Sequence, residues 1–343
     1  MGRIGIWNTA FLGDAVLTLP LIRTVKAAFP DSPVDFYVRK GVESLFSAQP
    51  ELDNVYAYDK RGSQKSIFAA MSYGRELAKK KYSLWISAHT SLRSGVIARW
   101  TSAHTRIGYN RPLFNNWLYT TTVDRKFSEL EEIDRLMQLV KPLSITDTLE
   151  WPEMVLPQAG YDEADAFWEK HITAPVLGVH PGSVWATKRW PAEYYSEVVA
   201  KAIDAGAQVM VFAGPGEESM AQEVITKSGV EDSDRLIDLS GALTLVNLAA
   251  FLNKLNCYVT NDSGPMHIAW AQRTPVTAIF GPTVRELGFY PRGESSTVLE
   301  TSLECRPCGL HGPKTCPEGH FKCMHSITPE MVWADASKKL FTT

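Results

Sequence analysis

Short apolar runs alternate with longer amphipathic stretches along most of the chain. A buried strand reads as roughly four to eight apolar residues, whereas a surface helix repeats its apolar positions roughly every three to four residues. In the first half, this pattern predicts strands over residues 3–8, 34–38, 55–58 and 84–87, and helices after residue 14 and over 41–48, 67–80 and 129–139. Strands that alternate with helices indicate a parallel sheet covered on both faces.

The same alternation returns in the second half, after a proline-bearing stretch at 149–159 that is typical of a linker. The pattern there predicts strands over 176–180, 208–213, 236–239, 257–260 and 276–280, helices over 192–205, 217–227, 244–253 and 266–272, and a last helix over 329–340. We therefore predict an α/β protein with two doubly wound domains, residues 1–157 and 158–327, followed by a helical segment, 328–343. Such domains bind ligands at the carboxyl ends of their strands, here in a cleft between the two.

The composition is that of an ordinary globular protein, with 343 residues, 45% hydrophobic and 21% charged, and a net charge of −3. The charge is uneven, because residues 1–150 carry 20 Lys and Arg against 15 Asp and Glu, whereas the remainder carries 15 against 23. A basic first half favours an anionic partner there. Residues 94–122 lose the periodicity and predict a loop-rich binding rim.

The sequence disfavours several classes of protein. The first residues lack the apolar core and cleavage site of a secretory signal, and no run reaches the ~18 apolar residues of a membrane span, so we expect a cytoplasmic protein. There is also no GxGxxG, the motif with which dinucleotide oxidoreductases bind their cofactor. No nucleic-acid partner is expected.

The turn after the first strand contains Gly13 and Asp14. A carboxylate at the start of a helix is favoured electrostatically, so Asp14 can be a simple helix cap. The alternative is a general base, because a helix end fixes the carboxylate within reach of a hydroxyl proton. Gly13 would let a substrate approach the backbone closely.

A second loop follows the strand at 176–180. Ser183, the backbone N–H groups after it and the Lys188 ammonium would form a cradle for a diphosphate. Taken alone, the loop also fits a surface segment with solvated cations. Trp185 and Trp190 are unusual in such a segment and favour a site.

Two further loops in the second half carry carboxylates. Glu217, or its neighbour Glu218, can accept hydrogen bonds from ribose hydroxyls, although Glu is also common at helix starts for electrostatic reasons. The triplet at 232–234 spells the DXD of metal-dependent transferases, but its polar setting before a strand predicts a surface turn.

The loop at 261–267 joins a buried strand to an apolar helix. Asp262 and Ser263 are good helix caps, which is the plain structural interpretation. The functional one is that Asp262 accepts bonds from sugar hydroxyls while Ser263 and Gly264 offer N–H groups to phosphate. His267, one turn later, either neutralises a leaving phosphate or is a hydrogen-bonded core histidine.

Four of the five cysteines cluster near the C-terminus, at Cys305, Cys308, Cys316 and Cys323. Four thiolates with a CxxC opening could form a tetrahedral structural zinc site, and three histidines lie nearby in the sequence. The irregular second half departs from paired CxxC knuckles, so reduced thiols packed in a loop are the alternative. Disulfides are disfavoured in a reducing compartment.

Together these segments resemble glycosyltransferase family nine, the bacterial lipopolysaccharide heptosyltransferases. The matching pieces are FLGDAVLTLP, HPGSVWATKRWP and NDSGPMHIAWA, and CRPCGLHGPKTCPEGHFKCM resembles the tail of the heptosyltransferase II branch. The resemblance spans essentially the whole chain. It implies a GT-B fold, with two facing Rossmann-like domains, an acceptor-binding first domain, a donor-binding second domain and the last helix packed back on the first.

The resemblance also implies the reaction. Heptose in the L-glycero-D-manno form would pass with inversion from ADP-heptose to a Kdo- or heptose-bearing inner core on lipid A, at the cytoplasmic face of the inner membrane, with no cofactor required. The catalytic aspartate falls on Asp14, the phosphate-contacting lysine on Lys188, the sugar-contacting aspartate on Asp262 and the ribose-binding glutamate on Glu217. Two alternatives stay open: another GT-B enzyme, with a different donor or acting as a nucleotide-sugar 2-epimerase, and an inactive GT-B binding protein.

Overall fold

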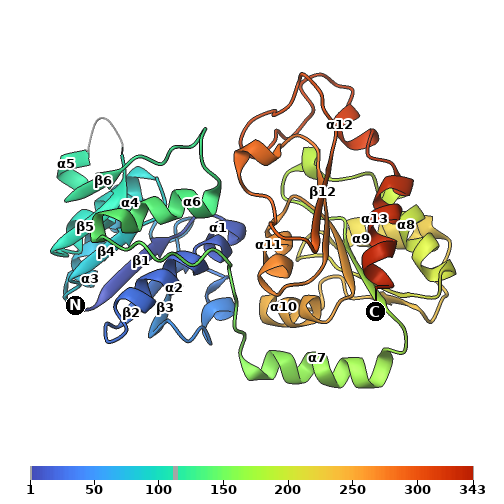
Figure 1. Cartoon of the computed structure of the whole chain (residues 1–343), viewed down its shortest axis with the longest axis horizontal. Helices are drawn as coiled ribbons and strands as arrows, with labels where there is room; N and C mark the ends of the chain where they lie inside the picture. The colour runs from blue at the N-terminus through green and yellow to red at the C-terminus, as the bar shows by residue number, and fades with distance from the viewer. Residues whose placement is uncertain (1, 111–114, 343) are drawn as a thin grey trace. The chain divides into compact units, whose positions relative to one another are not determined.

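A computed structural model describes residues 2–110 and 115–342. The chain divides into two compact units, Met1–Pro157 (unit 1) and Gln158–Thr343 (unit 2), which are coloured from blue to green and from green to red in Figure 1. Within the described residues, no helix is long and apolar enough to cross a membrane.

Unit 1 is built on a six-stranded sheet in the order β3-β2-β1-β4-β5-β6. All pairings are parallel, and Ile4 in the central strand faces Val34 on one side and Leu84 on the other. The strands are β1 (Ile4–Asn8), β2 (Val34–Arg39), β3 (Asn54–Tyr58), β4 (Leu84–Ser87), β5 (Thr105–Tyr109) and β6 (Thr121–Val123). The helices are α1 (Leu12–Leu17), α2 (Leu19–Ala28), α3 (Ile67–Ala78), α4 (Leu92–Trp100), α5 (Asn115–Leu118) and α6 (Glu132–Met137), with short 3-10 turns at Glu43–Phe46 and Gln138–Leu143.

One face of this sheet carries a buried aromatic cluster. Trp7, Tyr37, Tyr58 and Trp85 come from four neighbouring strands, and their rings lie 4.8 to 5.9 Å apart where they pair with Trp7. Side chains of a strand alternate between its two faces, so one residue per strand in matching phase builds such a layer. Helix α3 packs closely on α4 because Gly74 has no Cβ; a Cβ there would lie only 2.6 Å from the Cβ of Trp100.

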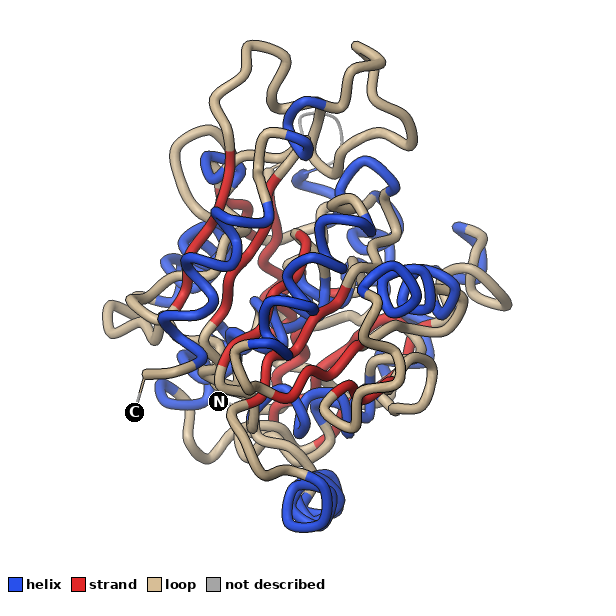
Figure 2. Tube along the Cα trace, turned by 90° about the vertical axis from the view of Figure 1, so that its right-hand side faces the viewer, coloured by secondary structure: helices blue, strands red, loops and turns tan. Residues whose placement is uncertain are grey.

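Unit 2 repeats the topology with the order β12-β11-β10-β7-β8-β9, again with parallel pairs throughout. The strands are β7 (Val176–His180), β8 (Gln208–Val211), β9 (Leu236–Asp238), β10 (Cys257–Asn261), β11 (Val276–Phe280) and β12 (Ser296–Glu300). The helices are α7 (Gln158–His171), α8 (Ala192–Asp204), α9 (Glu218–Ser228), α10 (Leu245–Asn253), α11 (Gly264–Ala271), α12 (Lys322–His325) and α13 (Pro329–Leu340), with 3-10 turns at Ala186–Lys188 and Arg285–Leu287. Figure 2 shows the strands in red lying between blue helices, the layering of two doubly wound, Rossmann-like domains. The predicted fold class is therefore confirmed.

The last helix, α13, packs on the core of unit 2. Val332, Ala336 and Leu340 on α13 are fully buried members of the unit 2 core, and the helix packs against α8, β10 and β11. Its apolar face is thus taken up within unit 2. The expected packing of this segment on the N-terminal domain stays a prediction.

Two other segments differ from the pattern-based expectation. Residues 94–122 form most of α4 together with β5, α5 and β6, not a loop-rich rim, although residues 111–114 of that range lie outside the described part. The helix predicted over 41–48 shrinks to the 3-10 turn at Glu43–Phe46. Pro20 lies in the first turn of α2, after the helix break at Thr18. Proline is tolerated there because the backbone N–H groups of a first turn have no partner within the helix, so no hydrogen bond is lost.

Candidate functional site

The two sheets share one topology, and so each has a point where the chain leaves neighbouring central strands in opposite directions. In unit 1 this point lies between β1 and β4, and in unit 2 between β7 and β10. Loops at the carboxyl ends of such strands leave a crevice, which is where doubly wound proteins bind ligands. The residues singled out in the sequence lie in the loops after β1, β7, β8 and β10.

Asp14 lies in the first turn of α1, directly after the loop that leaves β1. Its Oδ2 accepts a hydrogen bond from the Phe11 backbone N–H at 3.0 Å, so the capping role holds. Burial raises the pKa of the half-buried carboxyl, and the Phe11 N–H and the charges of Arg125 and Lys60 offset only part of that rise. A carboxylate with a raised pKa is a stronger base, which suits proton abstraction. Gly13 precedes it and is buried.

A buried ion network lies near Asp14. Both carboxylate oxygens of Glu132 accept from Arg125, at 2.8 and 2.7 Å, and Arg135 adds a third bond at 3.1 Å. Burial raises the pKa of Glu132, the charge of Arg125 opposes this, and the negative charge of Asp14 raises it further. The network holds Arg125 as a cation whose charge acts on Asp14.

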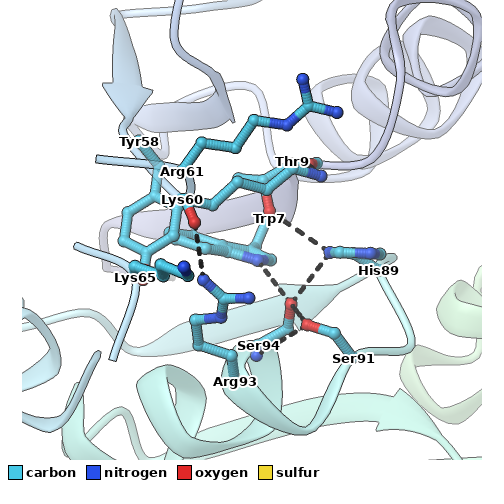
Figure 3. Close-up of a pocket in the computed structure, with 10 residues that line it drawn as sticks. All are labelled: Trp7, Thr9, Tyr58, Lys60, Arg61, Lys65, His89, Ser91, Arg93 and Ser94. Carbon is cyan, nitrogen blue, oxygen red and sulfur yellow. Dashed lines mark hydrogen bonds between the residues drawn. The ribbon is translucent and has the colours of Figure 1, made fainter. Parts of the chain in front are cut away.

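A pocket of about 500 Å³ opens at the carboxyl ends of β1, β3 and β4 (Figure 3). None of its ten lining residues is acidic and four are Lys or Arg, so it is suited to an anion. The lining residues are Trp7, Thr9, Tyr58, Lys60, Arg61, Lys65, His89, Ser91, Arg93 and Ser94.

Hydrogen bonds fix the floor of this pocket. The Nδ1 atom of His89 lies 3.2 Å from the Thr9 hydroxyl and 3.1 Å from that of Ser94, and Ser94 also accepts from the indole N–H of Trp7 at 2.9 Å. Arg93 donates to the carbonyl of Lys60 at 2.8 Å (Figure 3). The polar groups therefore hold one another in position, and none of the ten lining residues is a carboxylate.

Lys60 connects the pocket to the loop that carries Asp14. Its ammonium donates to the carbonyls of Thr9 and Ala10, at 2.5 and 3.3 Å. Burial and the neighbouring Arg39 and Arg61 lower its pKa to about 8. An anion bound in the pocket would favour the charged form and raise that pKa again.

In unit 2, Lys188 and Asp262 form a buried ion pair. The Nζ atom of Lys188, at the end of the turn after β7, lies 2.5 Å from Oδ2 of Asp262, at the end of β10. The Thr283 hydroxyl, from the loop after β11, donates to the same oxygen at 2.7 Å. Burial raises the pKa of Asp262, but the charge of Lys188 and the two hydrogen bonds outweigh it and hold that pKa below the usual value. Asp262 is therefore ionised at neutral pH.

His267 lies on α11 beside this pair. It is buried, and among the described residues its Nδ1 has no hydrogen-bond partner. Burial lowers its pKa to about 4, an effect that the charge of Asp262 opposes and that of Lys188 reinforces. At neutral pH the ring is thus a neutral group with one free nitrogen, which can donate or accept a bond depending on the tautomer.

The loop before Lys188 is tied to the end of β10. The Asn261 side chain accepts from the Trp190 backbone N–H at 3.0 Å and donates to the Pro181 carbonyl at 2.9 Å. Trp190 is a core residue whose indole N–H donates to the Ile327 carbonyl, so it supports the loop and does not line a site. Ser183 is buried in the same loop.

The start of α11 leaves polar groups for a ligand. Ser263 precedes the helix and Gly264 is its first residue. The Ser263 side chain makes no capping bond, so the expected capping role does not extend to its hydroxyl. First-turn N–H groups of a helix carry partial positive charge and bind phosphates readily.

Glu217, at the end of the loop after β8, is directed towards the β7 loop. Its Oε2 lies 3.6 Å from Nε2 of His180, whose Nδ1 pairs with the Tyr258 hydroxyl at 2.9 Å. Gly182 leaves room for this carboxylate, because a Cβ there would lie 2.4 Å from the Glu217 oxygen. Glu218 instead accepts from the Gly216 N–H. The geometry therefore groups Glu217, and not its neighbour, with the Lys188 loop.

The cysteines do not assemble a metal site in the structure. Cys305, Cys308 and Cys316 are partly exposed free thiols, whereas Cys323 is buried in the unit 2 core. Across residues 2–110 and 115–342, no group of three or more Cys, His, Asp or Glu is placed to hold a metal ion. The four thiols as placed do not fit the tetrahedral zinc set that their spacing suggested. The acidic pair at 232–234 is exposed in the turn before β9.

Several residues of these sites carry no recognisable sequence motif. His180 ends β7 and Thr283 lies in the loop after β11, and each contacts a carboxylate that the sequence did single out. In unit 1, the sequence motifs singled out none of the four cations that line the pocket. The dense run of Lys and Arg at 60–65, directly after a strand, is the signal that could have indicated them.

Comparisons with known proteins agree with this architecture. Residues 70–320 match the sequence profile described as "Glycosyltransferase family 9 (heptosyltransferase)". The chain is 23% identical over 340 residues to lipopolysaccharide heptosyltransferase 2 of Escherichia coli strain K12, covering 96% of each chain. A crystal structure of a glycosyl transferase family 9 protein from Veillonella parvula superposes with a TM-score of 0.88 at 28% identity, covering 99% of this chain and 98% of that one. The E. coli heptosyltransferase WaaC with ADP-2-deoxy-2-fluoro heptose shares the fold, with a TM-score of 0.73 at 19% identity, covering 98% of this chain and 99% of that one.

Proposed function

Because the chain belongs to glycosyltransferase family 9 (heptosyltransferase), we propose that it moves L-glycero-D-manno-heptose from ADP-heptose to the inner core of lipopolysaccharide. The observation that carries the proposal is the buried group of Lys188, Asp262 and Thr283, which lies where a doubly wound domain binds its ligand. The E. coli relative named above is a lipopolysaccharide heptosyltransferase, and the related WaaC was crystallised with an ADP-heptose analogue, which supports the choice of donor.

The donor is assigned to unit 2. Lys188 has three N–H donors and gives one to Asp262, so the others can bind the diphosphate. Asp262 accepts from hydroxyls of the heptose, and Glu217 accepts from the ribose. The backbone and hydroxyl groups of Ser183, Ser263 and Gly264, with neutral His267, complete the cradle.

The base is assigned to Asp14 in unit 1. Its carboxylate takes the proton of the acceptor hydroxyl as that oxygen forms a bond to the anomeric carbon of heptose. The bond from this carbon to the diphosphate breaks on the opposite face, and ADP leaves with the electron pair, which inverts the centre. Lys188 and the positive end of α11 stabilise the charge on the departing ADP.

The acceptor is assigned to the basic pocket of unit 1. Lys60, Arg61, Lys65 and Arg93 supply positive charge with no carboxylate among the lining residues, which suits phosphate groups or Kdo carboxylates of an inner core. Such an acceptor is anchored in lipid. The proposed place of action is therefore the cytoplasmic face of the inner membrane, with peripheral contact only.

Incubation with ADP-heptose and a panel of truncated lipopolysaccharide cores tests the proposal. We expect one core to gain a single heptose with stoichiometric release of ADP, and no gain with the Asp14→Asn variant. If the protein bound ADP but modified none of the cores, an inactive binding protein would be the better description. Release of UDP from UDP-N-acetylglucosamine without an acceptor would instead favour a 2-epimerase.

A further inference from the structure

The segment after β12, residues 301–320 (the cysteine-rich loop), contacts the loop that carries Lys188. The Thr187 hydroxyl donates to the Pro313 carbonyl at 2.5 Å. The His311 ring stacks on Trp185, with ring centroids 5.9 Å apart and planes 7° from parallel. The cysteine-rich loop is therefore attached to one side of the donor site.

The same loop also contacts a second side of the site, the turn that follows β11. The backbone N–H of Cys308 donates to the Pro282 carbonyl at 2.9 Å. Gly312 lies between the two sides, since a Cβ there would be 2.8 Å from Cγ of Pro282 and 3.0 Å from Oγ1 of Thr187. Its φ of +72° is also one that glycine adopts without strain. The cysteine-rich loop thus joins the two segments that supply Lys188 and Thr283.

Arg306 makes the densest set of contacts in this connection. Its side chain is 4% exposed and donates to the carbonyls of Phe280 at 3.1 Å and Thr283 at 2.6 Å, and also to that of Gly281. Nη1 donates to the carbonyl of Thr301, and Nη2, which faces Phe280 and Thr283, also lies 2.9 Å from the carboxylate of Glu300 and shares its two N–H groups among the three acceptors. A guanidinium can do this because it presents five N–H groups in a rigid plane, whereas the three donors of a lysine share one nitrogen.

The contact with Thr283 connects Arg306 to the donor site. Arg306 holds the Thr283 carbonyl, and the hydroxyl of the same residue donates to Asp262. Without Arg306, the carbonyls at 280–283 would lose a common donor and the turn would be free to move. A hydroxyl that moves by about an ångström no longer makes its bond to Asp262.

We propose that Arg306 is a positioning residue for nucleotide binding, which holds the turn after β11 so that Thr283 stays bonded to Asp262 beside Lys188. The inference rests on the proposed function only in taking Lys188 and Asp262 as the nucleotide-sugar site. It gives the arginine between the first two cysteines of the cluster a role that needs no metal.

The test is a double-mutant cycle on the full chain, with ADP as the probe and isothermal titration calorimetry as the measurement. Arg306→Gln and Thr283→Val are each expected to raise the Kd for ADP roughly tenfold, and the double variant to raise it no further than the larger single effect. Arg306→Lys keeps the charge beside Glu300 but not the fork of donors, so it should not restore affinity. Arg285→Gln is the matched control, because Arg285 also pairs with Glu300, at 3.1 Å, but contacts none of the carbonyls at 280–283.

A second readout separates positioning from a general loss of stability. Loss of the Thr283 bond raises the pKa of Asp262, because that bond lowers it now. The fall in ADP affinity at low pH (the acid limb) should therefore begin at a higher pH. The shift should be the same in Arg306→Gln and Thr283→Val. Additive effects on Kd, or an unchanged Kd and acid limb in Arg306→Gln, would overturn the proposal.

The outcomes distinguish this inference from the proposed function. If the wild type binds ADP and the Arg306 variants behave as the wild type, only the role of Arg306 fails. If the wild type binds no ADP, the donor assignment fails. The same set of variants is then compared by the pH midpoint of acid unfolding, which also depends on the pKa of Asp262. If Arg306→Gln does not fold, Glu300→Gln, which removes one of its anchors, takes its place in the cycle.

Discussion

The points where the chain leaves the central strands in opposite directions have the same scaffold in the two units but different electrostatics. β1 and β4 in unit 1 occupy the positions that β7 and β10 occupy in unit 2. At the first of these points, in unit 1, the pocket is lined by four cations and by no carboxylate. At the second, Lys188 is already neutralised by Asp262.

This difference indicates how one fold could serve two kinds of ligand. An uncompensated basic pocket attracts a strongly charged group and releases it when salt or pH weakens the field. Under the proposed function, the buried, internally paired site would recognise hydroxyls and a diphosphate by geometry, since its hydrogen bonds have fixed directions. The ligand class is set by the loops and not by the sheet.

The largest effect is expected at Asp14, the one carboxylate on the basic side that we assign to chemistry. Asp14→Asn keeps an oxygen that can accept from Phe11 but removes the base, so kcat should fall about 10²- to 10⁴-fold. Steady-state kinetics with ADP-heptose and the acceptor measures this. ADP affinity and the thermal unfolding midpoint should stay at wild-type values. A variant that transfers heptose at the wild-type rate would refute the base assignment.

The next effect tests the paired side. Lys188→Met leaves Asp262 buried without its cation, which should cost about 3–5 kcal/mol of unfolding free energy. Urea unfolding at neutral pH measures it. The matched control is Lys227→Met, because Lys227 pairs with Glu223 on the surface of the same unit and should change the midpoint little. Equal losses in both variants would contradict the contrast between a buried and an exposed pair.

A pH titration sharpens the comparison further. The pKa of His267 falls from 6.5 to about 4 on folding, so between these values the folded state binds fewer protons than the unfolded one. Stability that is complete above pH 6.5 is therefore lost as the pH falls towards 4, by roughly 3 kcal/mol for this group. Urea unfolding from about pH 7 to about pH 4.5 should show a shallower loss in His267→Gln. An identical slope in both proteins would mean that His267 does not titrate in this way.

The smallest effects are expected for single cations of the basic pocket. Arg61→Gln and Lys65→Gln each remove one exposed charge, and each should raise KM for the acceptor roughly fivefold. Both should also reduce the sensitivity of KM to salt, because fewer ionic contacts remain to be screened. Acceptor kinetics at low and high ionic strength measures this. Lys338→Gln, an exposed lysine on α13, should change neither quantity.

The sheets could be predicted because buried parallel strands are continuous apolar runs. The runs at 84–87 and 176–180 match β4 and β7 to the residue. Elements with little apolar surface were missed. Only Gly160 and Ala164 are buried on the 14 residues of α7, and only Val298 is buried on the edge strand β12, so neither has a pattern to detect.

The site residues divide in the same way. Asp14, Lys188 and Asp262 each lie in a distinctive local motif, so they could be singled out. The partners of Arg306 lie at 280–283 and 300–301, and nothing in its local sequence indicates that these segments meet around it. The pocket cations come from several elements that only the fold brings together. Convergence of this kind depends on tertiary structure, which a local pattern does not contain.

The order in which the strands pair within each sheet also affects how the chain folds during synthesis. β1 occupies the centre of its sheet and pairs on one side with β4, so the first strand waits until Leu84 has been made. β6 completes that sheet at Val123, before any residue of unit 2 is translated. Unit 1 can therefore finish its core while the ribosome is still building its partner, which limits the time for which its aromatic strands are exposed to wrong pairings.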